Sequence, residues 1–347
     1  NRGIGTLFGS LLAFTCCASV SAWATAWFIY NSELWPGLNG LPLAPLVVGF
    51  SVVPFLIWEQ YSSQLLYSME QYRIHNNAVV LGNLLSLLSI YTLLPTTYHG
   101  LLFVVVAMLP SQVMAPLTGL LVLMRLTKRL GSETRVSLPQ IYALLKGGAR
   151  LHTATIGGLA ASSLTVLIIH NKLGATEAGY FQMAAQLVGT IGLLSQVVCM
   201  IMYSEIARLG ANPSWKHHRK LVQWTLCAVI VIAITLGFFA AAIVELVAGK
   251  QFSNVVPIFR QMLVGSIGAS LSILMTPHWV GRGLFAHTAI LTIVAASINL
   301  SLVFLLLPHH GVQAGAISYT ATGFFSLAGN GIFYLYCDRK LSNDEKM

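Results

Sequence analysis

Three ionisable side chains lie within long apolar stretches of this sequence: Glu59, Glu245 and Arg260. A charged group in hydrocarbon is costly and usually faces a cavity or a partner helix. Arg260 could face a central cavity and hold an anionic group there. It could also extend to the membrane surface or pair with Glu245 from the preceding apolar stretch. Glu59 has two possible roles: it could be a protonatable coupling group, or it could form a hydrogen bond with a neighbouring helix.

Two further arginines stand at the ends of apolar stretches, each with a histidine nearby. Arg150 and His152 stand at the start of the stretch 151–170, and Arg282, with His278 nearby, lies in the turn 276–283 at the end of the stretch 254–280. An arginine can hold a phosphate group through two parallel hydrogen bonds. An arginine in such a connection can equally be a topology anchor. Glu205 lies three residues before Arg208, a spacing that favours an ion pair on one helix.

Signatures of catalysis are absent from the sequence. It has no Walker loop, no pair of acids in a loop and no metal-binding spacing of histidine and carboxylate. The five cysteines show no paired spacing, so we expect neither disulfides nor a zinc site. The sequence predicts a protein that is not an enzyme and needs no cofactor or metal.

The composition predicts an all-α protein that crosses a membrane many times. Only 8% of the 347 residues are charged and 56% are hydrophobic, whereas soluble domains carry about 25% charged residues. Segments of about 20 apolar residues span a bilayer as helices. We expect ten of them: 7–30, 41–67, 77–95, 99–125, 151–170, 177–203, 221–249, 254–280, 285–307 and 311–336.

The lysines and arginines give these segments an orientation. Of the 19, 16 lie in the odd-numbered connections, counted from the N-terminus, and only Lys172 and Lys250 lie in the even-numbered ones. Cytoplasmic connections carry the excess of positive charge. Both ends of the chain are therefore expected in the cytoplasm. A net charge of +9 distributed in this way does not indicate nucleic-acid binding.

A shift of about 212 residues relates the two halves of the chain. It brings 7–30, 41–67, 77–95 and 99–125 onto later segments, and it aligns His75 with His287. Segments 151–170 and 177–203 have no partner, and the sequence begins with Asn. We therefore expect two parallel six-helix repeats, the first lacking two helices that precede this sequence.

This repeat predicts two lobes and a linker. The N-terminal lobe is 1–125 and the C-terminal lobe is 151–336, followed by a cytoplasmic tail, 337–347. The linker, 126–150, contains the apolar stretch 138–146 with a basic end. That stretch is expected to be an interfacial helix on the cytoplasmic face, or the first turns of the helix that follows.

Parts of the C-terminal half resemble a known family. They are the stretch Leu173–Phe181 (LGATEAGYF) with the later AAQL at 184–187, the Gly281-Arg282-Gly283 turn, Asn299-Leu300, and the stretch Pro308–Ala316 (PHHGVQAGA). In these stretches the chain resembles bacterial polysaccharide flippases of the O-antigen (Wzx) type. These belong to the multidrug/oligosaccharidyl-lipid/polysaccharide exporter (MOP) superfamily. The resemblance covers about 140–336 well and 1–125 mainly through helix spacing.

This resemblance implies a MATE-like two-lobe bundle in the bacterial inner membrane. Such proteins flip undecaprenyl-pyrophosphate-linked oligosaccharide by alternating access during O-antigen or exopolysaccharide biosynthesis. The implied partners are this substrate, membrane lipid, a polysaccharide polymerase and a chain-length regulator. Arg260, Arg150, Arg282 and His278 are the expected substrate contacts, and Glu59 and Glu245 are the expected ion-coupling acids.

Two other functions compete with flipping. A multidrug exporter of the same fold would be driven by sodium or protons. A polysaccharide polymerase would carry a sizeable periplasmic loop, and no outer connection here exceeds about ten residues by the predicted segments.

Overall fold

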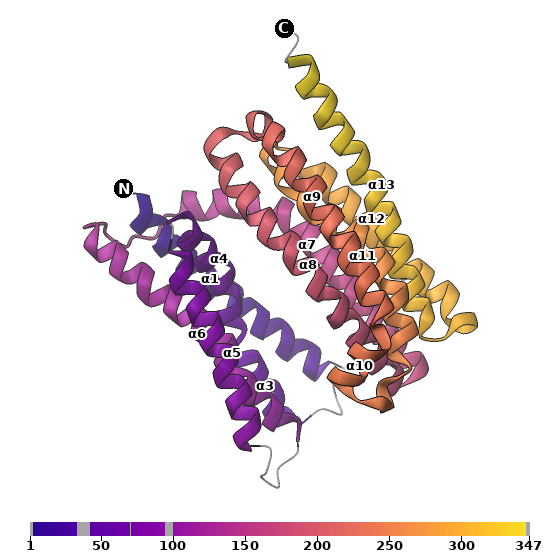
Figure 1. Ribbon diagram of the computed structural model, residues 1–347. Helices are drawn as coiled ribbons and strands as arrows, with labels where there is room; N and C mark the ends of the chain where they lie inside the picture. The colour runs from indigo at the N-terminus through magenta and orange to yellow at the C-terminus, as the bar shows by residue number, and fades with distance from the viewer. Residues whose placement is uncertain (1–2, 33–41, 70, 94–99, 345–347) are drawn as a thin grey trace. The chain divides into compact units, whose positions relative to one another are not determined.

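The computed structural model of the chain describes residues 3–32, 42–69, 71–93 and 100–344, and these residues form helices joined by short connections (Figure 1). They contain no β-strand, which agrees with the expectation that membrane-spanning segments satisfy their own backbone hydrogen bonds as helices. The chain divides into two compact units, Asn1–Lys146 and Gly147–Met347. The division falls inside the predicted linker.

Unit 1 is a bundle whose buried core lies between helices α1, α4 and α6. Its helices are α1 (Gly3–Asn31), α3 (Leu43–Ser51), α4 (Val53–Ser68), α5 (Tyr72–Leu93) and α6 (Leu101–Arg129). Phe8, Trp58, Leu66 and Leu123 pack together in this core. The indole Nε1 of Trp58 donates to the Pro116 carbonyl at 3.1 Å and so ties α4 to α6.

Unit 2 is built around one central helix. It contains most of α7 (Leu138–Leu173), then α8 (Ala175–Leu209), α9 (Ala211–Phe238), α10 (Ala240–Ala248), a 3₁₀ turn (Lys250–Phe252), α11 (Val255–Gly281), α12 (Phe285–His310) and α13 (Gln313–Asp344). In α11, 61% of an apolar window of 18 residues is buried inside the protein, whereas the buried share of the corresponding window is 22% in α8 and in α9. This helix packs against α8, α9 and α13.

Glycine allows α11 and α13 to approach each other closely. A Cβ atom added to Gly268 would collide with the carbonyl oxygen of Gly323, and one added to Gly323 would collide with that of Gly265. Small residues permit such backbone contact between membrane helices. Beside this contact, the Thr320 hydroxyl donates to the Gln261 carbonyl at 2.7 Å.

The predicted all-α membrane class is confirmed, with differences in individual segments. Seven helices in the described ranges are long and apolar enough to cross a membrane. The other three predicted segments correspond to α5, α7 and α13, each at least 22 residues long. At about 1.5 Å per residue, the 36 residues of α7 span roughly 54 Å, more than a hydrocarbon core of ~30 Å.

Two predicted segments are not continuous helices. The segment 41–67 is divided at Val52 into α3 and α4, and Pro54, which lacks an N–H group, lies in the first turn of α4. The segment 221–249 is divided at Phe239 into α9 and α10. Conversely, the predicted interfacial helix 138–146 and the segment 151–170 form a single helix, α7.

Each unit contains an aromatic ring against a histidine at the positions related by the 212-residue shift. In unit 1, the rings of Tyr67 and His75 lie edge to face, 5.4 Å between centroids. In unit 2, Trp279 and His287 are stacked at 6.2 Å. Both pairs join the end of one helix to the start of the next. The two pairs therefore occupy positions that the predicted repeat relates, with different ring geometries.

Candidate functional site

A chain of polar side chains, with two buried histidines at its centre, joins three helices of unit 2. Glu205 lies in the last turns of α8, His218 in the first turns of α9, and His278 near the end of α11, which Arg282 caps. The turn between α8 and α9 consists of Gly210, whose φ of 88° favours glycine. That tight turn places Glu205 beside His218 although thirteen residues separate them.

The hydrogen bonds in this chain have one consistent direction. Nη1 of Arg282 lies 2.8 Å from Nδ1 of His278, whose Nε2 lies 3.0 Å from Nδ1 of His218. Nε2 of His218 lies 3.1 Å from Oε2 of Glu205. Because a guanidinium only donates, Nδ1 of His278 accepts. Nε2–H of His278 therefore donates to His218, and Nε2–H of His218 donates to Glu205.

Aromatic side chains enclose this chain. Trp215 presents an edge to His278 at 4.7 Å and another to Tyr334 at 5.1 Å. The Arg282 guanidinium lies 5.9 Å from the centre of the Phe333 ring, within the range of a cation–π interaction. Both imidazoles have no exposed surface. The aromatic groups exclude water, so the hydrogen bonds act in a medium of low dielectric constant.

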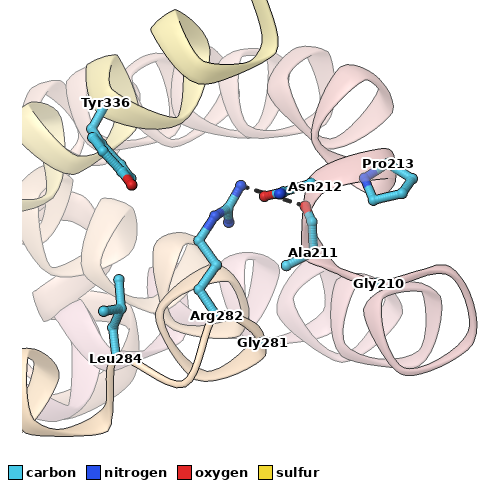
Figure 2. A pocket seen from close by; sticks show the side chains of 8 residues that line it. All are labelled: Gly210, Ala211, Asn212, Pro213, Gly281, Arg282, Leu284 and Tyr336. Carbon is cyan, nitrogen blue, oxygen red and sulfur yellow. Dashed lines mark hydrogen bonds between the residues drawn. The ribbon is translucent and has the colours of Figure 1, made fainter. Parts of the chain in front are cut away.

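Arg282 also lines a cavity of about 450 Å³ at this end of unit 2, between the start of α9 and the side of α13. Figure 2 shows the guanidinium pointing toward Ala211 and Asn212, with Tyr336 across the cavity. Its Nη2 lies 3.5 Å from the Ala211 carbonyl oxygen, and its Nε is buried without a hydrogen-bond partner among the residues that the structure describes. Burial lowers the pKa of the Arg282 guanidinium, which nevertheless stays charged at neutral pH because its ordinary value exceeds about 12.

A second cavity of unit 2, of about 500 Å³, lies among α7, α8, α11, α12 and α13. None of the described residues that line it is charged. Instead, its wall presents hydroxyl and amide groups: Ser162, Ser163, Thr165, Gln182, Gln186, Thr292, Asn299, Tyr319 and Thr322. Thr165 donates to Oδ1 of Asn299 at 2.8 Å, which links α7 to α12. Phe181 and Met262 add apolar surface.

The structure brings two of the predicted substrate contacts together and places a third elsewhere on α11. His278 is fully buried and accepts a hydrogen bond from Arg282 at 2.8 Å. Arg260 is exposed, and its Nε donates to the Gly237 carbonyl at 3.0 Å. The break at Phe239 removes the usual helical donor for that carbonyl. Arg150 lies in α7, but its side chain is outside the described residues.

The predicted acids have partners other than those expected. Glu245 pairs with Lys250 at 3.6 Å instead of Arg260. Glu59 is half-buried in α4. Glu205 contacts His218 rather than Arg208, because the Gly210 turn brings the start of α9 back toward the end of α8.

Sequence reasoning missed His218, Asn299 and Tyr319. The detectable signal for His218 was its position soon after Gly210, with Glu205 soon before it. For the cavity, the signal was polar residues at helical spacing within apolar segments, such as Gln182 and Gln186 four apart on α8.

Solved structures with this arrangement of helices are membrane transporters. An inward-facing multidrug resistance MATE family transporter of the MOP superfamily is 12% identical, with a TM-score of 0.73 over 100% of this chain and 87% of that one. The lipid II flippase MurJ, inward closed, is 12% identical, with a TM-score of 0.67 over 94% of this chain and 71% of that one. A MOP superfamily transporter from Pyrococcus furiosus is 11% identical, with a TM-score of 0.71 over 100% of this chain and 84% of that one.

These likenesses define the fold: an all-helical membrane protein with the MATE-like transporter architecture. Residues 4–257 match the family described as "Polysaccharide biosynthesis protein". The chain belongs to this family. No curated protein sequence matches the chain.

Proposed function

We propose that this protein moves a lipid-linked oligosaccharide across the bacterial inner membrane, from the cytoplasmic to the periplasmic leaflet, by alternating access. The product would feed the synthesis of O-antigen or another exported polysaccharide, with a polymerase and a chain-length regulator acting next. Membership of the polysaccharide biosynthesis family and the shared fold support this proposal.

The observation that carries the proposal is the uncharged polar cavity of unit 2. Sugars present hydroxyl groups that both donate and accept hydrogen bonds. The hydroxyl and amide side chains of the cavity offer both kinds of group. Its volume of about 500 Å³ falls in the usual range of small-ligand sites, ~300–1,000 Å³. Apolar surface from Phe181 and Met262 suits the non-polar faces of sugar rings.

The pyrophosphate of such a substrate needs cationic contacts. Arg260 is the best placed of the proposed arginines, since it is exposed and only its Nε has a partner among the described residues. The two Nη groups can bind an anion in the forked geometry that arginine favours. Arg150 is proposed as a second contact. Arg282 also remains a proposed contact, since it hydrogen-bonds His278 and lines the cavity of about 450 Å³.

The proposal is tested with the full chain in liposomes that contain fluorescent undecaprenyl-pyrophosphate-linked oligosaccharide. We expect the protein to make the labelled lipid in the inner leaflet accessible to an outside quencher. Gln182→Leu should slow this transfer, because it removes a donor and an acceptor from the cavity wall. The matched control is Gln251→Leu, an exposed glutamine outside the cavity, which should transfer at the parent rate. Equal rates for liposomes with and without protein would disprove the proposal.

The MATE structures favour one second candidate, the export of drugs by an ion gradient. A hydrophobic cation needs aromatic or acidic contacts rather than amides and hydroxyls. The same liposomes, loaded with a cationic dye and given a sodium or proton gradient, separate the two functions. Dye export without lipid transfer would favour the drug exporter.

A further inference from the structure

We propose that His218 and His278 form a proton-binding site whose occupancy separates the ends of α8, α9 and α11. This buried chain, from Arg282 through the two imidazoles to Glu205, is called the polar latch below. The inference rests on the proposed transport function only in assuming that the separation of the helix ends serves transport. The proton site itself is a property of unit 2.

The polar latch contains three hydrogen bonds, and two of them join helices: His278–His218 joins α11 to α9, and His218–Glu205 joins α9 to α8. Each bond uses one donor and one acceptor, and both imidazoles are neutral. No acceptor is left over on the imidazoles, since Nδ1 of each accepts and Nε2 of each donates. The closed arrangement therefore has one protonation state for the pair.

A proton added to either imidazole breaks this pattern. On His278 it would occupy Nδ1 and face an N–H group of Arg282 at 2.8 Å. On His218 it would occupy Nδ1 and face Nε2–H of His278 at 3.0 Å. A change of tautomer in His278 only moves the donor–donor contact to Arg282. The added charge would also lie beside the guanidinium in a water-poor site, where like charges repel strongly.

The groups around the imidazole pair do not offset this repulsion in full. They are Glu205 of α8, His217 and Arg219 of α9, Arg282 at the end of α11, His287 of α12, and Tyr334, Tyr336, Cys337 and Asp338 of α13. Arg219 and Asp338 pair with each other at 2.8 Å. Glu205 is the acid in contact with the pair, and it contacts only His218.

Separation of the helices removes the conflict. An imidazole in water titrates near pH ~6.5 and accepts a proton there without a competing donor. The open form binds protons that the closed form rejects, so acid shifts the population toward the open form. Below that pH, each titrating imidazole raises the ratio of open to closed by up to about tenfold per pH unit. The cavity of about 450 Å³ beside Arg282 gives the released guanidinium room to move.

Cys337 is the natural reporter of this opening. It is 1% exposed and packs with Trp215 and Met275 beside the polar latch. In a variant with Cys16, Cys17, Cys199 and Cys227 replaced by alanine, we would measure maleimide labelling of Cys337 from pH 8 to pH 5.5 in liposomes. Rates are divided by those of the chain unfolded in detergent at the same pH. We expect the corrected rate to rise roughly tenfold toward acid.

Matched substitutions locate the response. His217→Gln changes the exposed neighbour of His218 and should keep the full response. His218→Gln and His278→Gln each remove one titrating group from the polar latch and should each weaken the response, and the double variant should abolish it. A flat profile in the parent, or an unchanged response in folded His278→Gln and His218→Gln, would overturn the proposal.

If His218→Gln and His278→Gln both fail to fold, Arg282→Gln tests the proton site instead. Without the guanidinium, a proton on His278 meets less opposition in the closed form, so acid should open the helices less and the rise in labelling should be smaller. An undiminished rise would contradict the proton site. These measurements need no substrate. A chain that shows the response but transfers no lipid-linked oligosaccharide would keep the proton site and lose the proposed function.

Discussion

The helix pair α4–α5 of unit 1 and the pair α11–α12 of unit 2 are equivalent under the 212-residue shift, yet their buried positions differ in chemistry. Leu66 in α4 and His278 in α11 occupy the same place in the repeat, and both have no exposed surface. Leu66 contacts Phe8, Trp58 and Leu123 in an apolar core. His278 instead holds Arg282 and His218.

The comparison separates features that both units share from the proposed proton site of unit 2. The aromatic–histidine pairs, Tyr67 with His75 and Trp279 with His287, are present in both units and join consecutive helices. The polar latch is built on positions that are apolar or small in unit 1: Thr6 corresponds to His218, and Leu66 to His278. Unit 2 thus carries the proposed proton site at positions where unit 1 has Thr6 and Leu66.

The contact between α11 and α13 gives the largest expected effect. Gly268→Ala would drive a methyl group into the Gly323 carbonyl, and backbone cannot yield as a side chain can. We expect loss of most folded protein from the membrane fraction, measured by size-exclusion chromatography in detergent. In unit 1, a Cβ on Gly119 would lie 2.8 Å from the hydroxyl oxygen and 3.0 Å from the Cβ of Ser62, so it would meet a side chain and not a backbone carbonyl. Gly119→Ala should therefore remain folded, and equal losses would contradict this contrast.

The next largest effect is expected when each of the equivalent residues Leu66 and His278 is replaced by the other. His278→Leu leaves an N–H of Arg282 and Nδ1 of His218 without partners, at about 1–3 kcal/mol each. Leu66→His places an imidazole without a partner in an apolar core, which also costs about 1–3 kcal/mol. We expect both variants to melt at lower temperature than the parent. Only His278→Leu should also change the pH dependence of Cys337 labelling. If Leu66→His changed that pH dependence as well, the contrast between the two units would be wrong.

The helical class follows from the sequence because it depends on local composition. Apolar runs of about 20 residues and the scarcity of charge suffice to predict spanning helices. Their interruptions were harder to predict. Pro54 gave a local signal for the division at Val52, whereas the break at Phe239 follows no proline. Tertiary contact, such as the Arg260 bond to Gly237, stabilises that break.

The site was less predictable because its contacts join distant residues. Sixty positions separate His218 from His278, and 134 separate Thr165 from Asn299. Periodicity says which face of a helix is polar, but it does not say which helix that face meets. Arg282 and His278 were singled out correctly as neighbours, since four residues on a helix bring side chains together. Their partner on α9 required the fold.

Arg260 offers a test at the other end of α11. If its charge holds the substrate, Arg260→Ala should lower surface polysaccharide roughly tenfold or more, as the loss of a charged hydrogen bond would. Arg260→Lys keeps the charge but cannot reproduce the arginine fork, so we expect an intermediate level. Membrane abundance of each variant serves as the control. Equal polysaccharide in Arg260→Ala and the parent would remove Arg260 from the site and leave it as a cap for Gly237.

The smallest effect comes from Gly331, which corresponds to Gly119 in the repeat. Gly331 lies within α13, and a Cβ there would meet nothing within 4 Å. Alanine in a helix restricts the unfolded chain and stabilises the folded one by about 0.4–1 kcal/mol. Gly331→Ala should therefore raise the melting temperature slightly, whereas Gly119→Ala should lower it and Ser62→Ala should partly restore it. Melting temperatures that change in opposite directions in Gly331→Ala and Gly119→Ala would show that the two units share the order of their helices but pack them differently. Equal changes of melting temperature in the two variants would show that Ser62 moves aside without destabilising the protein.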